Sequence, residues 1–308
     1  MIRRRSVNRV GGFLVDAAVA ASAVLMSTGL MSTGLMSAGP AHAAPTDPAS
    51  LPYVNLGDSY SAGSGVAPTA PGSYPLCSQS LNNFAHVLAR RNGFRLTDVS
   101  CGGASTDDFF GSQYPGVPPQ LDALTPATRL VTVMIGGNDG SVFAGTIAKC
   151  VAAAAISGLN GTPCKNQYGS SIVRQLRTET YPNVVRTLTA VRAKAPGARV
   201  FIVSYPWLMP ATARNCPGFP IAPGDAVYTY DIQTTLNDVV KQAAEATGVR
   251  YVDVTSASAG HDACAPVGTR WVEPLVGSRH PVPVHPNALG QREIASILER
   301  NLSGGVEN

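Results

Sequence analysis

The sequence predicts an α/β fold in which helices cover both faces of a parallel β-sheet. Short apolar runs rich in Val and Ile alternate along the chain with longer segments whose apolar residues recur at helical spacing. Strands that alternate with helices form parallel sheets, because a helical crossover joins each strand to the next. No stretch typical of an interdomain linker interrupts this alternation, so residues 44–308 are expected to form a single domain.

Five segments are expected to form the strands of this sheet. They are residues 51–56, 95–99, 130–135, 200–204 and 251–254. Three other stretches are long, irregular and rich in Gly and Pro, and are expected to be surface loops. They are residues 102–128, 141–168 and 206–224.

Three helices are indicated by apolar spacing. The first covers residues 81–91. The second carries an apolar stripe and is expected to end at Gly248, because glycine adopts the left-handed conformation that closes a helix. The third is expected to begin with Pro286 as its first helical residue, since proline suits that position. The stripes are Phe84, Val87 and Leu88; Ile232, Leu236, Val239, Val240 and Ala243; and Ile294, Ile297, Leu298 and Leu302.

The composition excludes several classes of protein. Of 308 residues, 44% are apolar and 14% are charged, which is typical of a globular protein and not of a disordered chain. Four arginines and one aspartate in residues 1–44 account for most of the net charge of +4. The rest of the chain has no run of Lys and Arg, so no nucleic-acid partner is expected.

The first 43 residues are typical of a secretory signal peptide. The segment Met1-Ile-Arg-Arg-Arg is followed by an apolar stretch from Gly11 to Leu35, and small residues lead to a cleavage site after Ala43 or Ala44. An uncleaved membrane anchor is the alternative, but Ser, Thr and Gly interrupt the apolar stretch after Leu25. The mature protein is therefore expected outside the cell, without stable insertion in a membrane and as a monomer. Whether the Sec or the Tat route exports it stays open.

Cysteine usage agrees with an oxidising compartment. All six cysteines follow the signal peptide, and neither a CxxC motif nor a Cys/His cluster typical of a metal site occurs. Three disulfides are expected, although six cysteines permit 15 pairings. The simplest hypothesis joins neighbours along the chain: Cys77–Cys101, Cys150–Cys164 and Cys216–Cys264.

Polar motifs follow three predicted strands and precede the last helix. In an open parallel sheet, ligands bind beyond the carboxyl ends of the strands, so these motifs are expected on one rim. Each motif alone is more often a turn, a helix cap or a packing residue. Together they offer a nucleophile, a base and donors for an oxyanion. They are Gly57-Asp58-Ser59-Tyr60, Cys101-Gly102-Gly103, Gly136-Gly137-Asn138-Asp139 and His285-Pro286-Asn287.

These four blocks, in this order, resemble the SGNH (GDSL-type) hydrolases, most closely the secreted bacterial lipases and esterases of that family. The resemblance extends from Leu51 to Leu302. It implies a three-layer flavodoxin-like fold with a five-stranded sheet in the order 2-1-3-4-5, no metal or organic cofactor, and a carboxylic ester or lipid as substrate. It also favours the disulfide pairing between neighbours.

The resemblance implies a role for each site residue. Ser59 matches the nucleophile and His285 the general base. The Ser59 N–H, the Gly103 N–H and the Asn138 side chain match the oxyanion hole. A serine hydroxyl needs such a base to become nucleophilic, and oxyanion donors stabilise the charge of the tetrahedral intermediate.

One position departs from the family pattern. The family usually has Asp three residues before the histidine, where this chain has Val282. Because Val282 lies between two prolines, its backbone is restricted to extended conformations. Its main-chain carbonyl is therefore expected to accept a hydrogen bond from Nδ1 of His285. Glu273 or Asp262 in that role, or a water molecule, are the alternatives.

Other functions use parts of the same motifs. An acyltransferase or a phospholipase would use the same residues, and a catalytically silent binding domain could share the fold. The Gly-x-Ser-x-Gly elbow of the classical α/β-hydrolases is absent, because Ser61 stands where its second glycine would be. A dinucleotide site is disfavoured, since Pro68 replaces the third glycine of the phosphate fingerprint. Aromatic and apolar residues in two loops, at 109–114 and 207–219, form either an acyl groove or a cover for the core.

Overall fold

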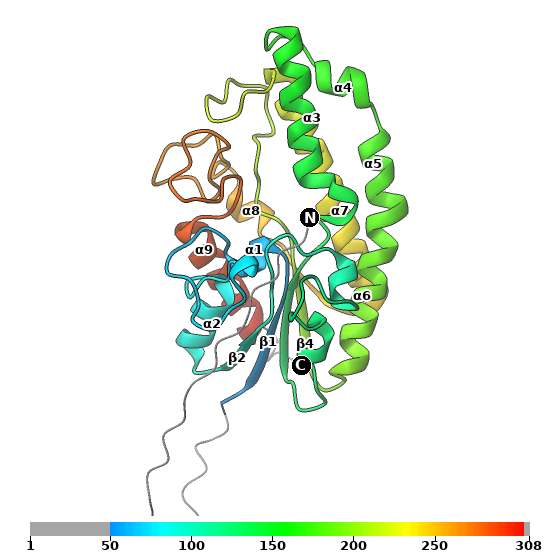
Figure 1. The fold of residues 1–308 in the computed structure, drawn as a ribbon, viewed down its shortest axis with the longest axis vertical. Helices are drawn as coiled ribbons and strands as arrows, with labels where there is room; N and C mark the ends of the chain where they lie inside the picture. Colours follow the sequence, from blue (N-terminus) through cyan, green and yellow to red (C-terminus); the bar gives the residue numbers. More distant parts are fainter. Residues whose placement is uncertain (1–49, 305–308) are drawn as a thin grey trace, which may run out of the picture. The chain divides into compact units, whose positions relative to one another are not determined.

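A computed structural model describes residues 50–304 of the chain. The predicted signal peptide, residues 1–43, lies outside the described residues. Five parallel strands form one sheet in the order β2-β1-β3-β4-β5 (Figure 1), as the resemblance implied. The strands are β1 (Pro52–Gly57), β2 (Arg95–Asp98), β3 (Leu130–Met134), β4 (Arg199–Val203) and β5 (Arg250–Val252).

The central strands are buried on both faces. All five residues of β3 are buried, and Leu56 of β1 and Ile202 of β4 are fully enclosed. In register, Leu56 pairs with Val133, which in turn pairs with Ile202. Buried strands of this kind lack the polar alternation of a half-exposed sheet, because helices cover both sides.

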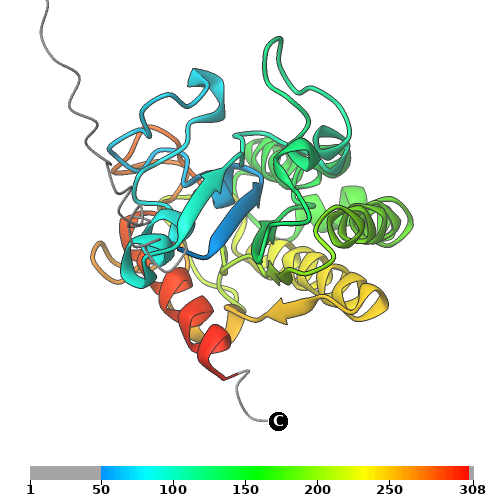
Figure 2. The same cartoon turned by 90° about the horizontal axis from the view of Figure 1, so that it is seen from below.

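Helices cover the two faces of the sheet in pairs. Figure 2 shows α2 (Phe84–Asn92) and α9 (Ala288–Ser303) on one side, and α6 (Tyr181–Lys194) and α7 (Pro223–Thr247) on the other. Gly248 ends α7 in the left-handed conformation, as predicted. The shorter helices are α1 (Ser59–Ala62), α4 (Pro163–Tyr168), α5 (Ser171–Gln175) and α8 (Thr255–Ser258).

The predicted loop at 141–168 is wrong. This stretch forms α3 (Val142–Ser157) and α4, because its alanine-rich centre favours a helix more strongly than the flanking Gly and Pro oppose one. The helical run over α5 and α6 was not predicted either. Pro182 sits at the start of α6, directly after a π-helical segment (Leu176–Thr180). The wider π turn lets the helix continue up to a proline, which would otherwise break it.

The predicted start of the last helix is also wrong. Helix α9 begins at Ala288, and Asn287 caps it by accepting hydrogen bonds from Leu289 N (3.0 Å) and Gly290 N (3.0 Å). An Asn cap satisfies two free N–H groups, which a proline at the first position cannot do. Pro286 therefore lies before the cap.

The three disulfides join the predicted neighbours. They are Cys77–Cys101, Cys150–Cys164 and Cys216–Cys264. The first links a turn to the loop after β2, the second links α3 to α4, and the third links two loops beyond β4 and β5. All three thus tie segments that follow the carboxyl ends of strands.

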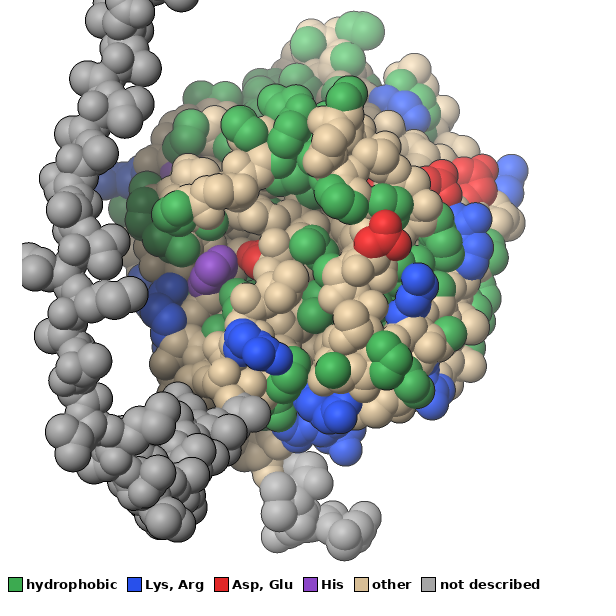
Figure 3. Space-filling view, turned by 60° about the horizontal axis from the view of Figure 1, so that its bottom comes forward, with side chains coloured by type: hydrophobic (Ala, Val, Ile, Leu, Met, Phe, Trp, Pro, Cys, Tyr) green, Lys and Arg blue, Asp and Glu red, His purple; other side chains and the backbone are tan. Residues whose placement is uncertain are grey.

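The opposite end of the sheet, where the strands begin, faces the viewer in Figure 3. Lys and Arg side chains lie there singly or in small groups, separated by neutral and apolar surface. The polar motifs lie at the other end.

Candidate active site

Ser59 lies at the first turn after β1. The strand ends at Gly57, whose φ of +130° brings it so close to β3 that a Cβ would lie 2.3 Å from the Met134 carbonyl oxygen. Only glycine tolerates this conformation and approach. Asp58 then caps α1 by accepting a hydrogen bond from Tyr60 N at 2.9 Å. Ser59, the first residue of α1, is 9% exposed.

The His285 imidazole lies against the Ser59 hydroxyl. Its Nε2 is 2.7 Å from Ser59 Oγ, and its Nδ1 is 2.7 Å from the carbonyl oxygen of Pro283. A carbonyl oxygen only accepts, so Nδ1 carries the proton and Nε2 is left to accept from the hydroxyl. This is the arrangement of a nucleophile with its base.

The expected role of Val282 is wrong. The carbonyl that accepts from His285 Nδ1 belongs to Pro283, one residue later. Val284, between these two residues, adopts a φ of +65°, and this left-handed turn accompanies the contact of the Pro283 carbonyl with the Nδ1 edge of the ring. No carboxylate in residues 50–304 hydrogen-bonds the imidazole, since Glu273 pairs with Arg270 and Asp262 with Arg214. Val282 lines the cavity instead.

The loop that carries His285 is fixed at several points. Val284 N donates to the Glu273 carbonyl (3.0 Å), and Glu273 N donates to the His285 carbonyl (2.9 Å). The Tyr60 hydroxyl donates to the Val284 carbonyl at 2.6 Å. Tyr60, which follows Ser59, thus holds the strained turn at Val284, which precedes His285.

Burial shifts the ionisation of two groups at the site. Burial lowers the pKa of His285 to about 4, although the bond to the Pro283 carbonyl opposes this shift. Burial also raises the pKa of Asp58 to about 7, despite the hydrogen bond that its carboxylate accepts from the Tyr205 hydroxyl at 2.5 Å. His285 is therefore neutral at pH 7, the state a general base requires.

The predicted oxyanion residues border the same cavity as Ser59 and His285. Gly103, in the left-handed conformation, and Asn138 both line it. Asn138 Nδ2 donates to the Ala104 carbonyl at 2.9 Å, which leaves its second hydrogen free to bond elsewhere. Within residues 50–304, neither the Ser59 N–H nor the Gly103 N–H donates a hydrogen bond to another protein group.

Two loops that carry these donors are tied to each other and to α1. Thr106 donates through its N (2.9 Å) and its hydroxyl (2.8 Å) to the Asp139 carboxylate. Gly137 N donates to the Tyr205 hydroxyl at 3.0 Å, and the same hydroxyl donates to Asp58. Tyr205 therefore bridges the Gly137 turn and the N-terminal cap of α1.

The cavity beside Ser59 has a volume of about 570 Å³ and a mainly apolar lining. Its apolar wall comes from α3, through Phe143, Ile147 and Val151, and from Leu275 on the facing loop. The two loops with aromatic residues, at 109–114 and 207–219, do not line it. Phe109, Leu208, Met209 and Phe219 are instead buried in the core, so covering the core is their role.

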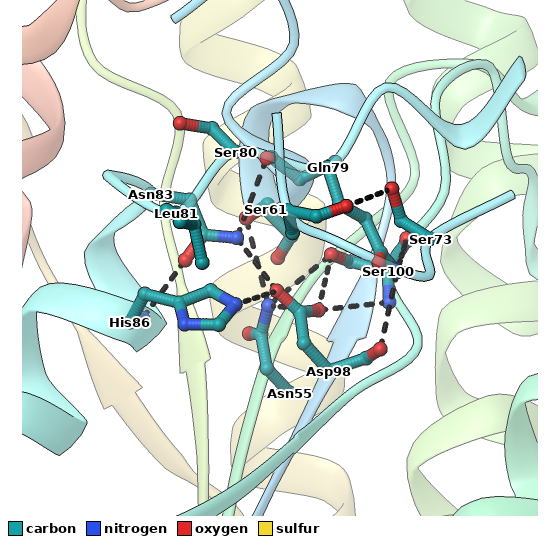
Figure 4. Close-up of polar contacts among 12 residues, drawn as sticks. Asn55, Ser61, Ser73, Gln79, Ser80, Leu81, Asn83, His86, Asp98 and Ser100 are labelled. Atoms are coloured by element: carbon teal, nitrogen blue, oxygen red, sulfur yellow. Dashed lines mark hydrogen bonds and ion pairs between the residues drawn. The ribbon is translucent and has the colours of Figure 1, made fainter. Parts of the chain in front are cut away.

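A cluster of buried polar side chains lies behind α1 (Figure 4). The Asp98 carboxylate accepts from Asn55 Nδ2 (3.0 Å), Asn83 Nδ2 (2.6 Å) and Ser100 Oγ (2.6 Å). The same two amides reach carbonyls of α1, Asn55 at Ser61 (3.5 Å) and Asn83 at Ala62 (3.3 Å). This cluster anchors the end of α1 that lies away from the cavity. No motif in the sequence predicted this cluster.

The other three histidines among residues 50–304 do not line the cavity. His86 Nε2 is 3.7 Å from the Asp98 carboxylate, and the His261 ring stacks on Trp271. His280 is partly buried and packs beside Gly65. Among residues 50–304, no group of three or more His, Cys, Asp and Glu side chains is placed to hold a metal ion.

The chain is similar to known lipases and acylhydrolases. The model of the GDSL-like lipase/acylhydrolase family matches residues 56–293. Lipase 2 of Streptomyces coelicolor is 53% identical over 248 residues, which cover 80% of this chain and 84% of that protein. Two crystal structures have a TM-score of 0.69, and each match covers 82% of this chain and 99% of the other. They are phospholipase A1 of Streptomyces albidoflavus (27% identical) and the extracellular lipase of Streptomyces rimosus (25% identical).

Proposed function

The chain belongs to the GDSL-like lipase/acylhydrolase family and is a carboxylic ester hydrolase, and we propose that Ser59 and His285 perform the hydrolysis as a Ser–His dyad. The observation that carries this assignment is the 2.7 Å contact between Ser59 Oγ and His285 Nε2 beside an apolar cavity. The Pro283 carbonyl orients the His285 ring, as a carboxylate does in a catalytic triad.

In the first half of the reaction, Ser59 Oγ attacks the ester carbonyl carbon while its proton passes to His285 Nε2. The carbonyl oxygen becomes an oxyanion. When the tetrahedral intermediate collapses, the bond to the alcohol breaks and the imidazolium returns the proton to the leaving oxygen. The acyl group stays on Ser59.

In the second half, a water molecule attacks the acyl-enzyme. His285 takes a proton from the water, a second oxyanion forms, and the C–O bond to Ser59 breaks. The proton then returns to Ser59 Oγ and the carboxylic acid leaves. The Pro283 carbonyl keeps the ring in one tautomer throughout, but it adds no full negative charge opposite the imidazolium.

The oxyanion is assigned to the Ser59 N–H, the Gly103 N–H and Asn138 Nδ2. Their free hydrogen-bonding capacity and their position around one cavity support this assignment. Each well-aimed donor in such a hole accelerates the reaction by roughly 10²–10³. The bonds of Thr106 to Asp139 fix the two donor loops before substrate binds, so no reorganisation is needed during the reaction.

The substrate class is inferred from the cavity wall. Phe143, Ile147 and Val151 offer apolar contact to an acyl chain attached to the reacting carbonyl. The relatives named lipase and phospholipase A1 support acyl lipids as substrates. Export is proposed as well, since three disulfides fit an oxidising compartment and one relative is described as extracellular.

The test compares two serines of the same short helix. Ser59→Ala should lower kcat for p-nitrophenyl butyrate by at least about 10⁴-fold, because the attacking oxygen is gone. Ser61→Ala is the matched control. The Ser61 hydroxyl donates to the Leu56 carbonyl at 2.8 Å and does not line the cavity, so kcat should stay within about threefold.

Covalent labelling gives an independent readout. A fluorophosphonate should modify Ser59 in the native protein and in Ser61→Ala, as located by peptide mass spectrometry. The proposal is wrong if Ser59→Ala retains turnover, or if the label is found on another serine.

A further inference from the structure

Helix α3 carries an apolar row that begins in the cavity and continues to the exposed end of the helix. Ala144 and Ala148 line the cavity. Ala152 and Ile156 follow at intervals of four residues, so they extend the same row along the helix. Ile156 is 90% exposed and Leu159, just beyond the helix, is 47% exposed. We call these five residues the α3 row.

The described part of the chain leaves this row uncovered. The stretch Asp139–Ser157, which contains α3, is the one helical stretch among residues 50–304 that is long and apolar enough to cross a membrane, yet only 28% of its apolar 18-residue window is buried. Its other face is fixed to the protein through Thr146 and Cys150, the latter joined to Cys164 in α4. In Figure 1 the far end of α3 stands above the carboxyl ends of the strands, at the top of the view.

The row carries no charge. Lys149 is the one charged residue of α3, and its Nζ lies 5.2 Å from the centre of the Tyr168 ring, towards α4. Two further exposed apolar side chains adjoin segments that line the cavity. Leu76 lies two residues before Ser78, and Val276 follows Leu275; Ser78 and Leu275 line the cavity. Leu76 and Val276 are each 58% exposed. Apolar surface that surrounds a site in this way marks an interaction surface.

We propose that the α3 row docks the enzyme on an uncharged lipid surface, with Ile156 and Leu159 inserted among the acyl chains. The inference rests on the proposed function, because the row leads into the cavity that would hold the acyl group. A lipid surface would supply both the apolar contact and the substrate, whereas a second copy of the chain on this row would obstruct the entrance. With Lys149 turned towards α4, the attraction is hydrophobic and does not require anionic headgroups.

The test measures binding without turnover. Proteins carrying Ser59→Ala are sedimented with phosphatidylcholine vesicles, with and without the added pair Ile156→Glu and Leu159→Glu. Loss of two inserted aliphatic side chains should weaken partitioning by at least about tenfold. Val267→Glu is the matched control. Val267 is also an exposed apolar residue (53%), but it lies outside the row and the cavity lining, so vesicle binding should be unchanged.

A soluble substrate separates this inference from the proposed function. With Ser59 intact, the pair Ile156→Glu and Leu159→Glu should hydrolyse dissolved p-nitrophenyl butyrate at the wild-type rate while losing activity on vesicles. Equal vesicle binding by both proteins would overturn the docking proposal alone. A dimer in light scattering that the two glutamates abolish would assign the row to a second copy and overturn it too. Absence of turnover on the soluble ester in both proteins would contradict the proposed function instead.

Discussion

The proposed base, His285, is oriented by a peptide carbonyl, and this has a measurable consequence. A carboxylate behind the ring would stabilise the imidazolium and raise its pKa. The Pro283 carbonyl contributes only a dipole, so burial dominates and lowers the pKa of His285 to about 4. The base thus stays neutral at acid pH values at which an ordinary histidine, with a pKa near 6.5, is mostly protonated.

The pH profile of the enzyme should follow this low pKa. The neutral imidazole is the active form, so titration of His285 should leave kcat/KM unchanged above about pH 5 and lower it as pH drops through about 4. The slope below that point should approach one logarithmic unit per pH unit. A profile with a non-ionising ester, over a range where circular dichroism finds the protein folded, measures it. Because burial raises the pKa of Asp58 to about 7, its titration falls near neutral pH. An acid limb centred near 6.5 that persists in Asp58→Asn would contradict an imidazole that burial keeps neutral.

The sequence predicts His285 as the base, and the structure places its ring against Ser59, but the carbonyl that orients the ring was predicted wrongly. The His-Pro-Asn block identifies His285 by its resemblance to the family. The acceptor depends on Val284, whose φ of +65° is rare for a β-branched residue. The turn is held by Tyr60 and by the backbone bonds to Glu273, which come from distant parts of the chain. Local sequence rules therefore placed the acceptor one residue too early.

At the scale of elements, α1 is too short to be stable alone and depends on its anchors. The Tyr60 hydroxyl binds the loop that carries His285. On the side away from the cavity, Asn55 and Asn83 donate to carbonyls of α1. Asp98 orients both amides, as Figure 4 shows. The position of Ser59, the proposed nucleophile, thus depends on a carboxylate that lies outside the cavity lining.

Asp98→Asn should therefore destabilise the protein strongly. The substitution replaces one acceptor oxygen by a donor and leaves buried groups without a partner, at a cost of about 1–3 kcal/mol for each. The expected loss in the free energy of unfolding is about 2–4 kcal/mol by urea titration. His86→Ala is the control. Burial lowers the pKa of His86, so its contact with Asp98 is weak at pH 7, and the loss should stay below about 1 kcal/mol. Equal losses would contradict this account of the cluster.

Strands were easier to predict than the helices around the site. The apolar runs of β1, β3 and β4 are short, which is typical of buried strands of a parallel sheet, and the structure buries them as expected. In α3 the glycines and prolines at the flanks dominated the interpretation, although the run from Val151 to Ile156 has strong helix formers. The polar cluster behind α1 combines three distant segments, which no local pattern reveals.

At the scale of the whole molecule, the parallel sheet gathers the motifs and the disulfides hold the loops that carry them. Every strand points its carboxyl end to the same rim, so residues 59, 103 and 138 meet although they are far apart in sequence. The order of the motifs along the chain was therefore enough to predict that these residues border one cavity. The shape of the cavity was not predictable, because it depends on where α3 and the loop at 275–285, which line it together, are placed.

The three disulfides should differ in what their removal changes. The loops they close have sequence separations of 14, 24 and 48 residues. Chain entropy then predicts losses of about 3 kcal/mol for Cys150–Cys164 and about 4 kcal/mol for Cys216–Cys264 on replacement by alanine pairs, measured by urea titration.

The Cys77–Cys101 pair should also change catalysis, because Cys101 joins the nucleophile turn to the oxyanion loop. Its N donates to the Gly57 carbonyl (3.0 Å), and Gly102 N donates to the Cys77 carbonyl (2.8 Å). Without the disulfide, the peptide before Gly103 loses its covalent anchor, and we expect kcat to fall by about tenfold at 20 °C in protein that is still folded. The Cys150→Ala and Cys164→Ala pair, which frees α3 from α4, should leave kcat on a soluble ester within about twofold. If both pairs lower kcat equally, general stability and not the oxyanion loop explains the loss.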